Sequence, residues 1–150
     1  MIALDGNALF LHRYITSTFS QWPLSLVKYI GGSSSNRLVE VGMQDAIEDL
    51  LYMHQVDVVI SGHVHVYVRS CDGLYTYNCA NGGPVYLIVG TGGQTLMDDP
   101  LLSKQHFTEY SNSNQFGVGR ATVYNATVLH WEFIAIGGDI TDEVWIRRDR

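Results

Sequence analysis

Two histidines one residue apart, His63 and His65, follow a short apolar run and are the side chains of this chain best suited to chemistry. On an extended backbone, residues i and i+2 point to the same side, so both imidazole rings can reach one cation or two neighbouring cations. Neutral imidazole is the commonest metal ligand in proteins, and ligands of α/β folds gather beyond the carboxyl ends of sheet strands. The pattern therefore predicts half of a metal site. The alternative is a pair of polar residues on a half-exposed strand.

Hydrophobic patterning predicts the elements that position this pair. Apolar residues at helical spacing predict an amphipathic helix over residues 43–54, with Glu48 on a solvated polar face. The apolar run 56–60 predicts a strand that is covered on both faces. Gly62 allows a sharp bend and a close approach to a ligand, and Val64 is expected to point away from the histidines into packing. A helix and a buried strand should therefore lead into a functional loop.

The second half of the chain is expected to be rich in β-strands, because short β-prone runs alternate there with glycine and asparagine. The expected strands cover residues 65–70, 85–90, 117–125, 127–135 and 143–148. Asn125 and Ala126 could form a hairpin turn, although they lack the favoured Asn-Gly pair. Residues 94–115 are expected to be loop, and residues 17–42 either line a site or form a disordered connection. The large apolar side chains expected in the core are Trp131, Phe133, Trp145 and Ile146.

Composition limits the classes of function. The 150 residues fit one domain or part of one. Charged residues make up only 16 %, the net charge is −6, and no basic block indicates binding to nucleic acid. A mean hydropathy of +0.02 and the lack of a long apolar stretch argue against a membrane span. The N-terminus carries Asp5 and lacks the pattern of a signal peptide.

Two further patterns bear on the compartment. Cys71 and Cys79 bracket a short segment that starts with a turn-forming Asp-Gly pair. The sequence leaves open whether they form a disulfide or remain free thiols. Asn125 starts an N-glycosylation acceptor, Asn-Ala-Thr, which fits an oxidising compartment. Such short acceptors also occur by chance.

With these residues in view, the chain resembles the purple acid phosphatases, a family of calcineurin-like metallophosphoesterases. Residues 56–69 are similar to the family pattern V-D-x-V-x-x-G-H-x-H-x-Y-x-R. Residues 83–93 resemble the strand and glycine turn that follow, and Phe116-Gly117 with residues 125–127 resemble the closing strands. The resemblance covers about residues 40–148.

The resemblance implies an α/β fold, a layered α/β sandwich of mixed sheets flanked by helices, of which residues 1–150 supply the C-terminal half. It also implies hydrolysis of phosphate monoesters at a dinuclear centre of iron with zinc, manganese or a second iron. His63 and His65 would each bind one metal, and His12 would be a further ligand. The family often continues this last histidine as H-x-P-x-Y, whereas His12 is followed by Arg-Tyr-Ile-Thr.

The chain departs from the family because the N-terminal ligand motifs, an Asp, G-D-x-x-Y and G-N-H-E, are absent. We therefore expect a partial catalytic domain that holds at most a partial metal site, is inactive alone, and offers no assigned catalytic residue. A small phosphorylated molecule is the expected substrate. A second copy or an N-terminal half would cover the open sheet edge. The family and the acceptor for glycosylation suggest a secreted, endomembrane or lysosomal protein.

The remaining assignments carry alternatives. Tyr67 and Arg69 alternate with His65 and are expected to share its face and support the site, with plain strand packing as the alternative. Asp57 is expected to make a structural hydrogen bond. Other histidines include His54 as a helix cap, His106 as a pocket-lining residue and His130 with no role. A β-rich binding module without catalysis, or an enzyme that hydrolyses phosphodiesters or nucleotides, is the competing function.

Overall fold

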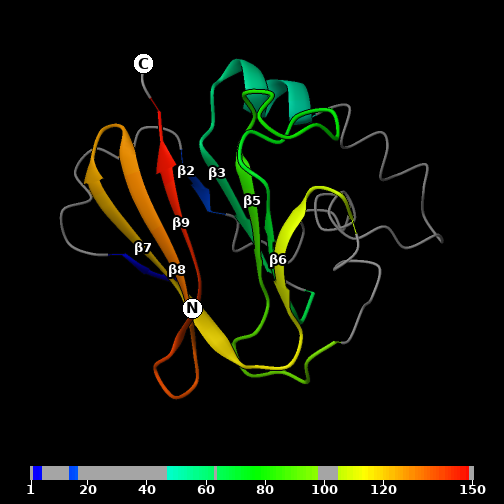
Figure 1. The fold of residues 1–150 in the computed structure, drawn as a ribbon, viewed down its shortest axis with the longest axis vertical. Helices are drawn as coiled ribbons and strands as arrows, with labels where there is room; N and C mark the ends of the chain where they lie inside the picture. The colour runs from blue at the N-terminus through cyan, green and yellow to red at the C-terminus, as the bar shows by residue number, and fades with distance from the viewer. Residues whose placement is uncertain (1, 5–13, 17–46, 63, 98–104, 149–150) are drawn as a thin grey trace.

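The computed structural model describes residues 2–4, 14–16, 47–62, 64–97 and 105–148 (Figure 1). Figure 1 shows two β-sheets side by side. The five-stranded sheet has the order β2 (Tyr14–Thr16), β3 (Val58–Ser61), β5 (Val85–Val89), β4 (Tyr67–Ser70), β6 (Thr108–Asn112). The four-stranded sheet has the order β1 (Ile2–Leu4), β7 (Gly117–Asn125), β8 (Val128–Ala135), β9 (Ile140–Arg147). Both sheets mix parallel and antiparallel pairs, as the layered α/β fold requires.

The strand directions in the five-stranded sheet bring the histidine motif to one edge. β3 runs parallel to both β2 and β5, and Ile60 lies opposite Leu87. β4 runs antiparallel to β5, so its first residue, Tyr67, lies opposite Val89 at the end of β5. The carboxyl ends of β3 and β5 and the start of β4 therefore meet. We call this the histidine edge, which comprises Ser61, Gly62 and residues 64–66 and 90–97.

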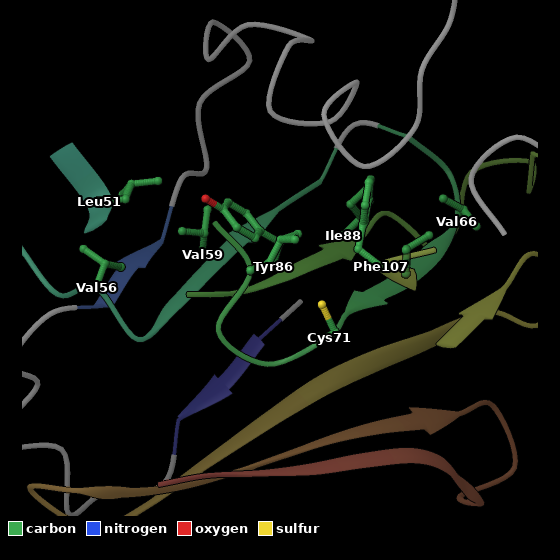
Figure 2. Close-up of a cluster of buried hydrophobic side chains, with 10 residues drawn as sticks. Leu51, Val56, Val59, Val66, Cys71, Tyr86, Ile88 and Phe107 are labelled. Atoms are coloured by element: carbon green, nitrogen blue, oxygen red, sulfur yellow. The ribbon is translucent and has the colours of Figure 1, made fainter. Parts of the chain in front are cut away.

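One core lies between the helix and the five-stranded sheet, where Val59 of β3 packs with Leu51 of the helix (Figure 2). The described part of the helix covers residues 47–53. The prediction of its solvated polar face is wrong in part, because the side chain of Glu48 is only 8 % exposed whereas that of Leu50 is 48 % exposed. The cause is a long-range contact, in which the backbone N–H of Thr76 donates to Glu48 Oε1 at 2.7 Å.

The second core fills the space between the two sheets. Val58 and Ile60 point into it from β3, so the prediction of a strand covered on both faces is confirmed. The four-stranded sheet contributes, among others, the buried side chains Trp131, Phe133 and Ile146. Trp145 was expected beside them, but it is 42 % exposed because it lies on the outer face of β9 and stacks on His130.

The expected strands agree with β5, β7 and β8 to within one residue. The hairpin turn between β7 and β8 is formed by residues 126–127, one residue later than the predicted turn at Asn125 and Ala126. β4 is shorter than expected at its start, and β9 begins three residues earlier. The polar loop expected over most of residues 94–115 is interrupted by β6, an unexpected strand that pairs with β4. The short strands β1 and β2 were not expected, and residues 17–42 lie outside the described residues.

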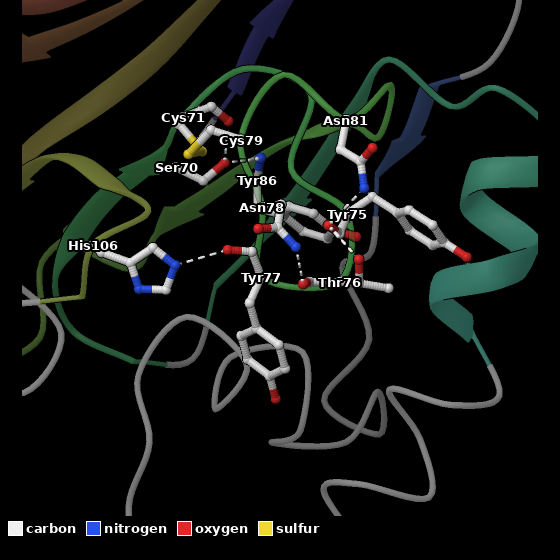
Figure 3. The surroundings of a disulfide bond; sticks show 10 residues. All are labelled: Ser70, Cys71, Tyr75, Thr76, Tyr77, Asn78, Cys79, Asn81, Tyr86 and His106. Atoms are coloured by element: carbon white, nitrogen blue, oxygen red, sulfur yellow. Dashed lines mark hydrogen bonds between the residues drawn. A yellow bond between two sulfur atoms is a disulfide. The ribbon is translucent and has the colours of Figure 1, made fainter.

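The opposite end of the five-stranded sheet, which we call the disulfide edge, comprises residues 71–84. Cys71 and Cys79 are joined by a disulfide bond, with their Cα atoms 5.7 Å apart (Figure 3). The loop between them reverses at Thr76 and Tyr77, whose φ angles of 48° and 63° are both left-handed. Tyr75 binds the loop to the helix, because its hydroxyl donates to Asp49 Oδ1 at 2.8 Å. Among the described residues, no helix is long and apolar enough to cross a membrane.

Candidate metal centre

The candidate metal site lies at the histidine edge, where the structure describes His65 and the residues around it. His63 and His12 lie outside the described residues, so their expected roles as ligands stay predictions. The described residues contain no group of three or more His, Cys, Asp or Glu side chains that could hold a metal ion. Of the three candidate ligands, His65 is the one that lies among the described residues.

The ring of His65 is oriented by a backbone carbonyl. Its Nδ1 lies 2.8 Å from the carbonyl oxygen of Thr95, in the segment that follows β5. A carbonyl oxygen only accepts hydrogen bonds, so Nδ1 carries the proton and the neutral ring has its lone pair on Nε2. This is the arrangement in which metal-binding histidines are commonly held, with one nitrogen donating to a carbonyl and the other free for the metal. His65 therefore fits a metal ligand that binds through Nε2.

The histidine loop is held by close packing against the turn after β5. A Cβ atom on Gly90 would lie only 1.7 Å from the carbonyl oxygen of Val64. The backbone N–H of Gly90 donates to the Val66 carbonyl at 3.1 Å, and that of Met97 donates to the His65 carbonyl at 2.8 Å. The two segments of the histidine edge therefore lie directly against each other, and this close approach leaves no room for a side chain at position 90.

The backbone around His65 is bent, which corrects the assumption of an extended strand. β4 begins only at Tyr67, and the N–H of Val66 donates to the Val64 carbonyl two residues earlier at 2.8 Å. Val64 packs against the core, as expected. A Cβ on Gly62 would have only one neighbour within 4 Å, the Val89 carbonyl oxygen at 3.9 Å, so packing within the described chain does not require glycine there.

Tyr67 and Arg69 bind the second sheet. The Tyr67 hydroxyl donates to Asp142 Oδ2 at 2.6 Å, and Arg69 donates to both carboxylate oxygens of Asp142 at 2.8 Å. Trp131 Nε1 donates to the Tyr67 oxygen at 3.0 Å, and the Phe133 ring stacks on the Tyr67 ring. These contacts join the two sheets two residues after His65. Whether they also support a metal site stays a prediction.

The electrostatics of this junction favour the neutral phenol and the charged guanidinium. Burial, followed by the negative charge of Asp142, raises the pKa of Tyr67. The hydrogen bond to Asp142 raises the pKa of Arg69 and outweighs the opposing effect of burial. A paired and fully hydrogen-bonded carboxylate can remain ionised between two sheets, so the junction is a structural ion pair whose charges are satisfied.

The other histidines lie away from the histidine edge. His106 Nε2 is 2.7 Å from the Tyr77 carbonyl oxygen at the disulfide edge (Figure 3), so its expected place in the pocket is not supported. His130 lies on the outer face of β8 with Nε2 2.9 Å from Glu143 Oε2. Asp57 forms the expected structural contact, because Arg148 Nε lies 3.2 Å from its Oδ1.

Comparisons with known proteins bear on the family of this chain. Residues 83–143 match the family described as iron/zinc purple acid phosphatase-like protein C. The probable purple acid phosphatase 20 of Arabidopsis thaliana is 37 % identical over 114 residues, which cover 71 % of this chain and 26 % of that protein. Acid phosphatase type 7 of Mus musculus is 28 % identical over 114 residues, covering 68 % of this chain and 26 % of that protein.

A solved structure of a purple acid phosphatase is also similar to this chain. The structure of a purple acid phosphatase from yellow lupin (Lupinus luteus) seeds matches with a TM-score of 0.65 and 25 % identity, covering 80 % of this chain and 24 % of that one. This chain belongs to the purple acid phosphatase family. It spans about a quarter of the length of the relatives named above.

Sequence reasoning missed the partners that hold His65 in this purple acid phosphatase chain. Thr95 and Met97 act through backbone atoms, which leave no mark on side-chain identity. Gly90 had a signal, because it starts a run of three glycines within four residues after an apolar strand. The close approach of Gly90 to Val64 explains why this first glycine is needed.

Proposed function

We propose that this chain forms the C-terminal part of a metal-dependent phosphate monoester hydrolase, an acid phosphatase of the purple acid phosphatase type. The observation that supports it best is the His65 ring, which lies at the carboxyl edge of a buried strand with Nδ1 bound to the Thr95 carbonyl. We place the remaining metal ligands in a longer protein, since the relatives are about four times the length that the chain matches.

In this proposal His63, His65 and His12 hold the metals. When bound, a dinuclear centre of iron with zinc, manganese or a second iron would supply a nucleophilic hydroxide and would neutralise charge on the phosphoryl oxygens. His65 contributes a neutral nitrogen ligand, which suits metals such as zinc and ferrous iron. The Thr95 carbonyl keeps the proton on Nδ1 and leaves the Nε2 lone pair for the metal. The substrate is a small phosphorylated molecule.

The test measures metal content and hydrolysis in the full-length protein that contains this chain. His65→Ala should remove at least one metal ion and lower kcat/KM for p-nitrophenyl phosphate by more than about 100-fold, because a direct ligand matters more than its hydrogen-bond partner. His106→Ala is the matched control, since this exposed histidine lies at the disulfide edge, and it should leave both quantities unchanged.

Three outcomes would contradict parts of this proposal. Unchanged metal content in His65→Ala and in His63→Ala would exclude both residues as ligands. Faster hydrolysis of bis-p-nitrophenyl phosphate or a nucleotide than of the monoester would indicate a diester- or nucleotide-hydrolysing enzyme. A wild-type protein with neither metal nor hydrolysis would indicate a β-rich binding module.

We also propose that the protein is made in the secretory pathway, and is secreted or retained in an endomembrane or lysosomal compartment. The disulfide between Cys71 and Cys79 supports an oxidising environment. The acceptor Asn125 is exposed at the end of β7, which supports N-glycosylation there. Mass spectrometry of the protein from a eukaryotic secretory host should show a glycan on Asn125. An unmodified Asn125 peptide would refute the modification.

The open sheet edge is proposed to be covered by another part of the longer protein or by a second copy. Among the described residues, β9 forms one edge of the four-stranded sheet and pairs with β8 alone. Such an edge exposes backbone groups that promote association. Size-exclusion chromatography with light scattering should show a dimer for this chain alone. A dilute, stable monomer would contradict the coverage by a second copy.

A further inference from the structure

The outer face of the four-stranded sheet carries exposed aromatic side chains next to the glycosylation acceptor. Tyr124 is 59 % exposed and Trp145 is 42 % exposed. Their ring centroids lie 5.2 Å apart, with an interplanar angle of 33°. The guanidinium carbon of Arg147 lies 5.4 Å from the centroid of the Trp145 ring. We call Tyr124, Trp145 and Arg147 the aromatic surface.

The aromatic surface is held in place from the sheet. His130 stacks on Trp145 with centroids 4.1 Å apart and an interplanar angle of 9°. Its Nε2 lies 2.9 Å from Glu143 Oε2, and the ring is almost entirely buried. Because the Trp145 ring rests on a buried ring, it is held in one orientation, which lowers the entropy cost of binding a ligand against it.

The acceptor asparagine is the next residue after Tyr124. Asn125 lies opposite Val128, and the register shifts between Val123 and Asn125, which leaves Tyr124 as the extra residue of a β-bulge. A bulge re-aims side chains relative to regular alternation. Both Tyr124 and Asn125 are exposed to solvent. The asparagine and the aromatic surface therefore lie at the same end of the β7–β8 hairpin.

The side chain of Asn125 is held through its amide oxygen. Its Oδ1 accepts from the backbone N–H of Thr127 at 2.9 Å and from Thr127 Oγ1 at 3.1 Å. Among the described residues, none accepts a hydrogen bond from Asn125 Nδ2. This nitrogen is the atom that bonds to the sugar in N-glycoproteins. The two hydrogen bonds hold the amide plane, so the direction in which a sugar leaves Asn125 is restricted.

We propose that the aromatic surface packs against the first N-acetylglucosamine of a glycan on Asn125. This inference rests on the proposed glycosylation of Asn125. A pyranose ring presents a face of C–H groups, which packs on the π-face of an aromatic ring. The sugar is uncharged, so its burial carries no penalty for desolvating an ion. The guanidinium of Arg147 offers N–H donors to sugar hydroxyl groups at the rim.

Covalent attachment favours this occupant over a separate partner. A sugar bonded to the residue beside Tyr124 is always present at high effective concentration, so a weak contact is enough to keep it on the surface. A separate protein partner loses translational and rotational entropy when it binds, and its contacts must compensate for that loss. Stable interfaces between proteins bury more than about 1,000 Å². Two exposed rings are too little surface for such an interface.

The test is the rate at which peptide N-glycosidase F releases the Asn125 glycan from the native protein, followed by site-specific mass spectrometry. The full-length protein is made in a eukaryotic secretory host as wild type, Tyr124→Ala and Tyr124→Phe. Loss of the packing should speed release about two- to tenfold in Tyr124→Ala, in line with the strength of one aromatic contact. Tyr124→Phe keeps the ring and should match the wild type. After denaturation all three proteins should be deglycosylated at the same rate.

The outcomes separate this inference from the glycosylation on which it rests. An Asn125 peptide without sugar would refute the glycosylation and the packing together. A glycosylated Asn125 with equal native release rates in wild type and Tyr124→Ala would overturn the packing alone. If Tyr124→Ala lowers Tm, Trp145→Ala replaces it as the test variant. This second variant should also speed native release, and an unchanged rate would overturn the packing.

Discussion

The two ends of the five-stranded sheet are held by different kinds of interaction. At the disulfide edge, a covalent bond and side-chain contacts bind the loop, including the Thr76–Glu48 and Tyr75–Asp49 hydrogen bonds. The rings of Tyr52 and Tyr75 also stack there with centroids 4.1 Å apart. At the histidine edge, the contacts of His65 in the described residues run to backbone atoms.

This difference indicates that the two ends of the five-stranded sheet have different roles. At the disulfide edge, the side chains that hold the loop are engaged in the disulfide and in hydrogen bonds, and those atoms are not available to a ligand. Backbone contacts at the histidine edge hold the loop through peptide groups and leave Nε2 of His65 for a ligand. Ligands bind at the carboxyl ends of strands in such sheets. The histidine edge is therefore the end at which an available atom such as Nε2 of His65 can contact a ligand. The opposite end is then available for stabilising contacts.

The largest expected effect comes from Gly90→Ala, which attacks the backbone packing of the histidine edge. The added Cβ would lie 1.7 Å from the Val64 carbonyl oxygen, so the histidine loop must move. We expect a loss of about 3 kcal/mol or more in the free energy of unfolding, because the overlap is with rigid backbone. Urea denaturation measures this loss, and metal analysis should show a lower metal content.

Gly62→Ala is the matched control, because a Cβ there has its nearest neighbour at 3.9 Å. It should change the free energy of unfolding by less than about 1 kcal/mol, since the substitution creates no overlap within the described residues. Equal destabilisation by the two substitutions would contradict the claim that the histidine edge depends on the close approach of Gly90 to Val64.

Removal of the disulfide tests the other end of the sheet. Cys71→Ala combined with Cys79→Ser should lower the free energy of unfolding by about 2–3 kcal/mol, because the open loop gains freedom in the unfolded state. The metal content should stay unchanged, because the disulfide edge lies away from His65. Dithiothreitol should lower the Tm of the wild type and leave the double variant unaffected. Loss of metal in this variant would show that the two edges are coupled.

Much of the fold could be predicted because its key segments are locally determined. The apolar run before the histidines indicated a strand buried on both faces, which Val58 and Val59 confirm from opposite cores. The strand β6 was missed because it is an edge strand of half-exposed polar residues, and its pairing with β4 is a long-range contact. Trp145 was misplaced because its face depends on the register of β9 against β8.

The candidate site was predictable only in part. His65 could be found from its spacing, whereas the Thr95 carbonyl that orients it is a backbone atom 30 residues away. Tyr67 and Arg69 do share one face, but the side chain they meet, Asp142, comes from the second sheet. Sequence alternation shows which residues of a strand share a face, and it leaves open which side of the sheet that face takes and which distant residues it meets.

A smaller effect is expected from Thr76→Gly at the disulfide edge. Thr76 has a φ of 48°, which costs a residue with a Cβ roughly 1–2 kcal/mol. Glycine removes this cost but adds about 0.5–1 kcal/mol of unfolded-state freedom. The net result should be a gain of between about 0 and 1.5 kcal/mol in the free energy of unfolding, measured by thermal or urea unfolding. Thr95→Gly, at a position without positive φ, should instead destabilise slightly, and a gain at both sites would contradict the strain at Thr76.

The smallest effect concerns the hydrogen bond between Tyr75 and Asp49 at alkaline pH. This bond raises the pKa of Tyr75 above its ordinary value of 10.0, followed by a smaller contribution from burial. A pKa that is higher in the folded state adds stability below the unfolded value, and this stability is lost as the pH rises through the folded value. The contact should therefore persist through pH values near the ordinary pKa of 10.0 and be lost only as the pH rises through the raised pKa of Tyr75. Asp49→Asn should lower the pKa of Tyr75, as measured by NMR of the ¹³Cζ resonance, whereas Asp139→Asn in the exposed β8–β9 turn should leave it unchanged. An unchanged Tyr75 titration in Asp49→Asn would mean that the carboxylate does not hold the loop to the helix.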